Sequence, residues 1–179
     1  MKAPELITPD VPIRLIEPNV ERDGQLGLQW LNGQLGRVTM RSMGNTEETI
    51  SKMLPTTIEQ EEERVSSFLD REDQLNWMIE YEGKVVGSVW VDLVASEDLP
   101  SPSVHIMIGD PDMRGRGVGI ATVGTVLEYL EKQGNDVIYS RHLVSNEGAD
   151  KLLKSLGFTE LDKPYISDTL EFQNLVRKS

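Results

Sequence analysis

Apolar and polar positions alternate with a period of two in several short stretches of the chain. Ile13–Ile16, Leu75–Tyr81 and Val85–Val94 show this pattern, and the last two are joined by Glu82-Gly83-Lys84. Alternation of this kind predicts strands, and a short connection containing glycine predicts a hairpin. Further strands are expected over 103–108 and 136–144, from Phe158 onward, and over 169–176.

Other stretches repeat their apolar side chains every three or four residues, which is typical of amphipathic helices. They predict helices over 21–31 and 57–71, from the glycine-rich loop near Gly119 to Gly134, and from a cap at Ser145 or Asn146 to Gly157. The acidic run Glu59–Glu63 is expected to be a solvated helix face. The segment 33–55 has no clear period and predicts no element. Strands and helices therefore mix along the chain, which indicates an α/β fold.

Composition narrows the possible functions. No repeat or linker divides the 179 residues, so we expect a single domain over 1–179. The net charge of −12 argues against a protein that binds nucleic acid mainly through phosphates. With no cysteine there is no disulfide, thiol nucleophile or thiolate metal site. The two histidines, His105 and His142, have no carboxylate at metal-ligand spacing, so no metal site is expected.

The beginning of the chain has no apolar segment typical of a signal peptide, and Val85–Ala95 is too short and polar to span a bilayer. We therefore expect a cytoplasmic protein without a membrane partner, either a monomer or a homodimer.

The loop Arg114–Gly119 carries the clearest chemical signal. Glycines allow a ligand to approach the backbone, and a turn that opens a helix presents unpaired N–H groups to an anion such as pyrophosphate. Two familiar nucleotide loops are excluded, because Ile120 stands where the dinucleotide fingerprint needs glycine and Thr125 stands where a Walker A loop needs lysine. A plain structural turn is the alternative interpretation.

At this loop the chain resembles the GNAT superfamily of acetyl-CoA-dependent N-acetyltransferases. The family's Arg/Gln-x-x-Gly-x-Gly/Ala signature matches Arg114, Gly117 and Gly119, and a second signature matches Asn146, Ala149, Leu152, Gly157 and Phe158. The stretch 104–111 is similar to the branches that acetylate ribosomal-protein N-termini and polyamines, and Gln29–Asn32 is similar to aminoglycoside 6′-N-acetyltransferases. The two signatures lie within roughly 77–158.

The resemblance implies a GNAT-like domain with flanking helices and a central, mostly antiparallel sheet of six to seven strands. A splayed pair of strands, over 104–108 and 137–144, would open a wedge for pantetheine. The backbone of Met107, Ile108 and Gly109 would pair with pantetheine, and Asn146 would meet its other side or act only as a helix cap. The pyrophosphate would be held by the amides of Arg114, Gly115, Arg116, Gly117, Val118 and Gly119.

The implied reaction moves an acetyl group from acetyl-CoA to a primary amine, by direct attack in a ternary complex. The acidic chain favours a small cationic amine or a protein N-terminus as acceptor. The amine must lose a proton first, and His105 is the first candidate base, with Glu80 and Asp92 as alternatives.

Many family members protonate the leaving thiolate with a tyrosine, where this chain has Leu153. Tyr165 is the candidate substitute, although a packing role is also open to it. The alternative function is an acyl-CoA-binding sensor or structural relative without efficient turnover.

Overall fold

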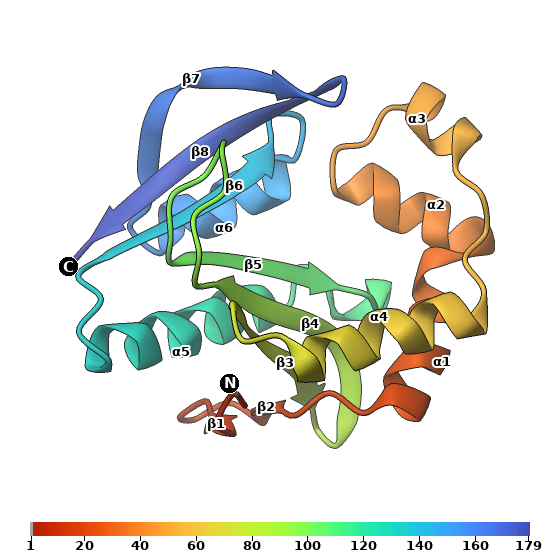
Figure 1. The fold of residues 1–179 in the computed structure, drawn as a ribbon, viewed down its shortest axis with the longest axis horizontal. Coiled ribbons are helices and arrows are strands. Elements are labelled where there is room, and N and C mark those ends of the chain that lie inside the picture. The colour runs from red at the N-terminus through yellow and green to blue at the C-terminus, as the bar shows by residue number, and fades with distance from the viewer. Residues whose placement is uncertain (1) are drawn as a thin grey trace.

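Eight strands form one sheet in a computed structural model that describes residues 2–179 (Figure 1). Their order across the sheet is β1-β2-β3-β4-β5-β6-β8-β7, and every neighbouring pair is antiparallel except β5 and β6. The bounds are β1 (Leu6–Ile7), β2 (Ile13–Ile16), β3 (Gln74–Tyr81), β4 (Lys84–Asp92), β5 (Ser103–Ile108), β6 (Val137–Leu143), β7 (Thr159–Ser167) and β8 (Leu170–Lys178).

The mixed α/β fold is confirmed, with one strand more than the six to seven expected. The additional strand is β1, which pairs with β2 and lies in the proline-rich beginning of the chain. Asp10 adopts a positive φ of 61° and the Thr8 amide donates to the carbonyl of Ile13, so the chain folds back on itself there. Two residues are too short for alternation to reveal a strand.

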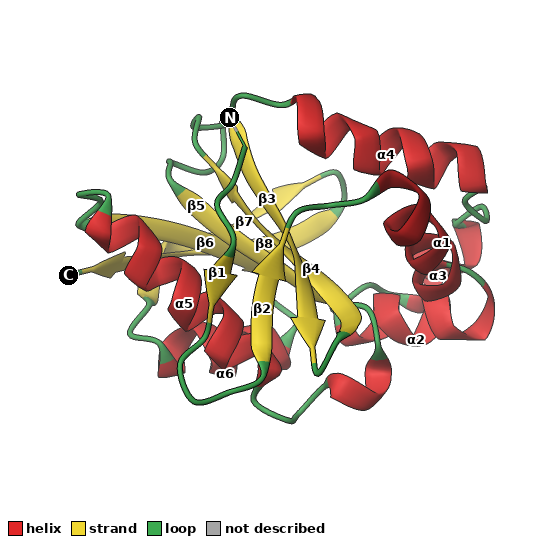
Figure 2. Cartoon of the chain, turned by 90° about the horizontal axis from the view of Figure 1, so that it is seen from below, coloured by secondary structure: helices red, strands yellow, loops and turns green. Residues whose placement is uncertain are grey.

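Helices cover both faces of the sheet (Figure 2). One face carries α5 and α6, and the other carries α1 to α4, near the hairpin of β3 and β4. Within residues 2–179, no helix is both long and apolar enough to cross a membrane. The bounds are α1 (Val20–Leu31), α2 (Gly33–Ser42), α3 (Glu47–Lys52), α4 (Ile58–Asp70), α5 (Val118–Lys132) and α6 (Glu147–Ser155).

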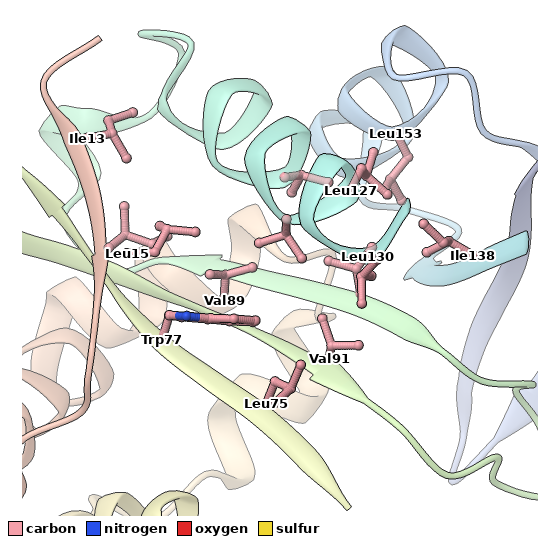
Figure 3. Close-up of a cluster of buried hydrophobic side chains, with 14 of the residues drawn as sticks. Ile13, Leu15, Leu75, Trp77, Val89, Val91, Leu127, Leu130, Ile138 and Leu153 are labelled. Carbon is pink, nitrogen blue, oxygen red and sulfur yellow. The ribbon is translucent and has the colours of Figure 1, made fainter. Parts of the chain in front are cut away.

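The main core lies between the sheet and α5 (Figure 3). Side chains from β2, β3 and β4, among them Leu15, Trp77 and Val89, point toward Leu127 and Leu130 of the helix. The periodic apolar positions of the sequence thus become the packed face of α5, and burial of this apolar area stabilises the fold. Leu153 of α6 joins the same core and is 4% exposed.

The acidic run at the start of α4 is not wholly solvated, which corrects the sequence prediction for Glu61. This carboxylate is 3% exposed and accepts hydrogen bonds from Thr56 Oγ1 and Arg64 Nε, both at 2.9 Å. It is buried because Gly27 leaves room on α1, where a Cβ on that glycine would lie 2.3 Å from Glu61 Oε2. Periodicity alone cannot show that a glycine of another helix admits a carboxylate.

A second close approach joins α1 to the end of β5. A Cβ on Gly109 would lie 2.1 Å from Cδ2 of Trp30, whose side chain is 5% exposed. Trp30 belongs to a smaller core cluster with Met78 and Val85. Glycine is therefore needed at 109 for packing, because a larger residue cannot fit beside the indole.

We expect Gly109→Ala to lower the free energy of unfolding by about 2 kcal/mol or more, as overpacking of a buried site typically costs 1–3 kcal/mol. Denaturant titration would measure the change. Gly124→Ala in α5 is the matched control, because its Cβ would meet only Leu156 Cδ2 at 3.9 Å, and it should leave stability unchanged or raised. Equal stability of the Gly109 variant and the wild type would contradict the packing role.

Candidate active site

The sheet opens between β5 and β6. These parallel strands pair only at Ser103 and Tyr139, and they diverge from that end (Figure 1). The shared end is fixed by the Tyr139 amide, which donates to the Pro102 carbonyl at 2.9 Å, and by Ser140 Oγ, which donates to the Val104 carbonyl at 2.7 Å. Beyond it, β6 continues to pair with β8, so one edge of β5 is left without a strand. We call this opening the wedge.

The backbone of β5 presents alternate residues to the wedge. The Gly109 amide donates to the Val86 carbonyl at 2.9 Å, so the backbone of Gly109 faces β4. In an antiparallel ladder every second residue faces the same neighbouring strand. The backbone of Met107 therefore also faces β4, and the backbone groups of Ile106 and Ile108 point toward the wedge. The Ile108 carbonyl is already occupied by the side chain of Arg114, at 3.0 and 3.2 Å.

The glycine loop ends in an open helix N-terminus. Gly115 and Gly117 have φ values of 70° and 80°, a conformation that residues with a Cβ rarely adopt. Gly117 is the N-cap of α5, and no side chain among residues 2–179 caps this helix. The first helical bond from the N-terminus joins the Ala121 amide to the Gly117 carbonyl, so the amides of Val118, Gly119 and Ile120 have no partner within the helix. This turn can therefore receive an anion.

The two arginines of the loop have different environments. Arg114 is half-buried and turns inward, with Nη2 donating to Thr39 Oγ1 at 3.0 Å as well as to Ile108. Burial lowers the pKa of this guanidinium, although the charge of Asp110 opposes the effect. The Arg114 amide donates to the Pro111 carbonyl at 3.2 Å. Arg114 thus braces the end of β5, whereas Arg116 is exposed beside the open helix N-terminus.

Helix α6 forms the opposite wall of the wedge. Asn146 Oδ1 accepts from the Ala149 amide at 3.1 Å, so Asn146 is a helix cap that also lines the cavity. Gly119 lies opposite Leu152, where a Cβ on the glycine would be 2.6 Å from Cδ1 of the leucine. The second signature of the sequence therefore meets the first across the wedge.

Three neighbouring cavities follow the wedge. The loop cavity, of about 260 Å³, lies beside Gly115, Gly119 and Asn146. It shares Ile106 and Leu152 with the central cavity, of about 360 Å³. The central cavity in turn shares lining residues His105 and Arg141 with the outer cavity, of about 300 Å³.

His105 and Asp92 meet where the central and outer cavities join. The strands β4 and β5 place them on one face of the sheet, with His105 Nε2 3.1 Å from Asp92 Oδ2 and 3.1 Å from Ser103 Oγ. The imidazole also stacks on Trp90, with ring centroids 5.4 Å apart. These contacts fix the ring, and Nε2 is the ring nitrogen that contacts the Asp92 carboxylate, so Nδ1 is the other nitrogen, at the opposite side of the ring.

Asp92 is held in its ionised form. Burial alone would raise the pKa of Asp92, but hydrogen bonds from His105 and Gln74 and the charge of Arg71 outweigh it, so the pKa lies below its ordinary value. An ionised carboxylate accepts a proton donor, which favours the tautomer of His105 with hydrogen on Nε2 and a lone pair on Nδ1.

The other two catalytic candidates lie elsewhere. Glu80 is paired with Arg14 at 3.1 Å near the hairpin end of β3, and it lines none of the three cavities. Tyr165 accepts a hydrogen bond from Arg141 Nη1 at 3.2 Å and stacks on Phe172. Phe172 and Arg141 line the central cavity, whereas Tyr165 is not among its lining residues.

Three features of the site have no counterpart among the residues that the sequence patterns indicated: Arg141, His142 and the wall formed by the end of α2. His142 is 7% exposed, lines the central cavity and lies 3.4 Å from Asp150. The Ser145 hydroxyl donates to the Gly44 carbonyl at 2.6 Å, which brings Met43 to the loop and central cavities. The signal available for Arg141 was its place on a strand expected to border the wedge.

Comparisons with known proteins agree with this architecture. A family model described as acetyltransferase (GNAT) family matches residues 45–158. An uncharacterized N-acetyltransferase of Methanocaldococcus jannaschii is 32% identical over 97 residues, which are 51% of this chain and 42% of that protein. An uncharacterized protein of the same organism is 30% identical over 103 residues, 57% of this chain and 21% of that protein. The chain thus spans less than half the length of these curated relatives.

Solved structures share the fold at low sequence identity. The microcin self-immunity acetyltransferase MccE, in complex with acetyl-CoA and AMP, has a TM-score of 0.73 at 14% identity, over 96% of this chain and 94% of its own. An aminoglycoside acetyltransferase in complex with acetyl-CoA scores 0.69 at 17% identity, over 94% and 93%. A ribosomal-protein α-N-acetyltransferase scores 0.73 at 12% identity, over 98% and 94%.

These structures include two of the branches that the sequence resembles, and the family model spans both signatures and the splayed strands. The chain belongs to the acetyltransferase (GNAT) family.

Proposed function

We propose that this protein transfers the acetyl group of acetyl-CoA to a primary amine of a small molecule or a protein N-terminus. The observation that carries the proposal is the placement of the Asp92–His105 pair at the junction of cavities that begin at the open turn of α5. Acetyl-CoA supplies an activated thioester when bound. The cysteine-free, acidic composition supports a cytoplasmic setting for this reaction.

The cofactor-binding roles follow the backbone directions. In this proposal the amides of Gly115, Arg116, Gly117, Val118 and Gly119, with the side chain of Arg116, hold the pyrophosphate. Ile108 contributes its amide to pantetheine, and Ile106 joins it because its backbone groups face the wedge. Met107 and Gly109 do not pair with pantetheine in this proposal, because their backbone groups are directed to β4. Asn146 lines the far wall while it caps α6.

His105 acts as the base in this proposal, and Asp92 positions it. An amine with a pKa of about 10.4 is neutral in only about one molecule in a few thousand at pH 7, a deficit of roughly 4–5 kcal/mol. Nδ1 of His105 can take the proton directly or through water, because Asp92 keeps the lone pair on that nitrogen. The ammonium gives this proton to His105 before its nitrogen attacks the thioester carbonyl. The C–S bond then breaks, CoA leaves as the thiolate, and the second proton of the nitrogen passes to the thiolate through water.

A family relative that binds acyl-CoA without efficient turnover is the second candidate, favoured by Leu153. This residue occupies the position of the usual tyrosine acid and is buried in the core. The decisive experiment combines CoA release from acetyl-CoA, measured with polyamines, aminoglycosides and peptides, with the thermal shift caused by acetyl-CoA. A thermal shift without CoA release for any amine would support the sensor. The absence of both the thermal shift and CoA release would contradict both candidate functions.

Tyr165→Phe should lower the rate of acetyl transfer less than tenfold, or by less than about 1.4 kcal/mol. Tyr165 is not among the residues that line the central cavity, and a thiol with a pKa near 8.5 can leave as the thiolate and take its proton from water. Steady-state turnover under saturating acetyl-CoA would measure the effect. A hundredfold loss with unchanged acetyl-CoA affinity would instead show that Tyr165 is the acid.

A further inference from the structure

We propose that Arg141 selects an acceptor in which the reacting amine is accompanied by a carboxylate. The inference rests on the proposed acetyl transfer and names the class of amine that it would use. It starts from one guanidinium at the junction of the central and outer cavities, on the same two cavity walls as His105.

Arg141 is a half-buried cation that has no anionic partner in the described part of the chain, residues 2–179. Its Nη1 donates to Tyr165 Oη at 3.2 Å, and its guanidinium lies over the ring of Phe172, 4.7 Å from the centroid. Across residues 2–179, no carboxylate lies within ion-pair distance of it. The side chain is therefore fixed by neutral groups.

Most arginines of this chain, which has 30 acidic and 18 basic residues, have a carboxylate partner. Six of the ten form ion pairs: Arg14, Arg22, Arg41, Arg64, Arg71 and Arg177. Arg114 is also half-buried among neutral groups, but its side chain donates to Ile108 and Thr39. Arg71 also lines the outer cavity, but both oxygens of Asp73 engage it, at 2.8 and 2.9 Å. Thus Arg141 retains its charge for a ligand even though carboxylates are abundant in this chain.

The chemistry of the guanidinium specifies the ligand. Arginine has five N–H donors in a planar fork that matches the two oxygens of a carboxylate, and Tyr165 uses one of them. The cation–π contact with Phe172 and the hydrogen bond to Tyr165 hold the guanidinium before a ligand arrives, and half-burial increases the strength of a charge-assisted hydrogen bond. Tyr165 is accordingly a positioning residue for Arg141.

Such an acceptor carries two opposite charges, and the junction of the two cavities offers a group for each of them. The amine would face His105 and the negative charge of Asp92, and its carboxylate would face Arg141. A pure polycation, in contrast, would bring positive charge against an unpaired guanidinium. The net charge of −12 favours a cationic acceptor. Arg141 departs from that expectation, because it favours a zwitterion, supplied by a free amino acid or by an acidic peptide N-terminus.

The test compares amines that differ only in their acid. One pair is 4-aminobutyrate and 4-aminobutanamide, and the other is the C-terminally amidated peptides Ala-Asp-Ala and Ala-Asn-Ala. Wild-type protein should favour the acid of at least one pair by tenfold or more in kcat/KM, and the pair that responds identifies the source. Arg141→Gln should reduce this preference to within twofold and leave the acetyl-CoA affinity unchanged, and Arg141→Lys should keep part of it.

Arg37→Gln is the matched control, because it removes the same charge from an exposed position of α2 and should keep the full preference. If acetyl-CoA releases CoA at equal rates with the acid and with the amide of each pair, the inference is overturned and the proposed transfer stays intact. A preference that survives Arg141→Gln would do the same. Absence of CoA release from these four amines, spermidine and an aminoglycoside would overturn the proposed transfer, and the inference with it.

Discussion

Gly119→Val is expected to lower the affinity for acetyl-CoA at least a hundredfold, or by about 2.7 kcal/mol. Gly119 lies in the first turn of α5 and lines the loop cavity opposite Leu152. Its Cβ alone would come within 2.6 Å of Leu152 Cδ1, so the leucine side chain must turn aside and the added methyl groups would extend into the wedge. They would also cover the amides that we assign to the pyrophosphate.

Isothermal titration of acetyl-CoA would measure this loss, with the unfolding midpoint recorded for each variant. Gly124→Ala is the control on the same helix and should bind as the wild type does, because it faces open space near Leu156. Gly117→Val should also lose affinity, since valine is strained at a φ of 80° and would change the turn. A folded Gly119 variant that binds acetyl-CoA within threefold of wild type would contradict the assignment of the loop.

His105→Ala is expected to lower kcat/KM for the amine at least a hundredfold at pH 7, within the range of 10² to 10⁴ typical of general bases. The loss should shrink as the pH rises toward the pKa of the amine, because the free base then exists without help from the enzyme. Affinity for acetyl-CoA should not change. Rates of CoA release across a pH series would show both effects.

Two substitutions separate the base from its neighbours. Asp92→Asn should cause a smaller loss, about tenfold, because an amide in place of the carboxylate weakens the preference for the His105 tautomer with a lone pair on Nδ1. Glu80→Gln should change the rate less than twofold, since Glu80 pairs with Arg14 away from the cavities. A large loss in the Glu80 variant together with an active His105 variant would transfer the role of base to Glu80.

The sequence by itself determined the features that depend on local backbone chemistry. Gly115 and Gly117 need positive φ values, and a glycine turn before an apolar helix leaves unpaired amides wherever it occurs. The spacing of Ala149, Leu152, Leu153 and Leu156 predicted the apolar face of α6, and the sequence pattern predicted all the strands of the sheet except the two-residue β1. These properties involve neighbours within a few residues, so a linear pattern records them.

The tertiary structure alone decided which side chains meet. Asp92 reaches His105 because β4 and β5 pair in one register, and the inward turn of Arg114 depends on Thr39 from a segment with no predicted element. The alternation that directs Ile106 and Ile108 to the wedge is likewise set by the β4 ladder. Arg141 has no carboxylate within ion-pair distance among residues 2–179 because the strands and helices around it bring none there. Such contacts join residues far apart in the chain, and their free energy depends on packing and burial that no local pattern contains.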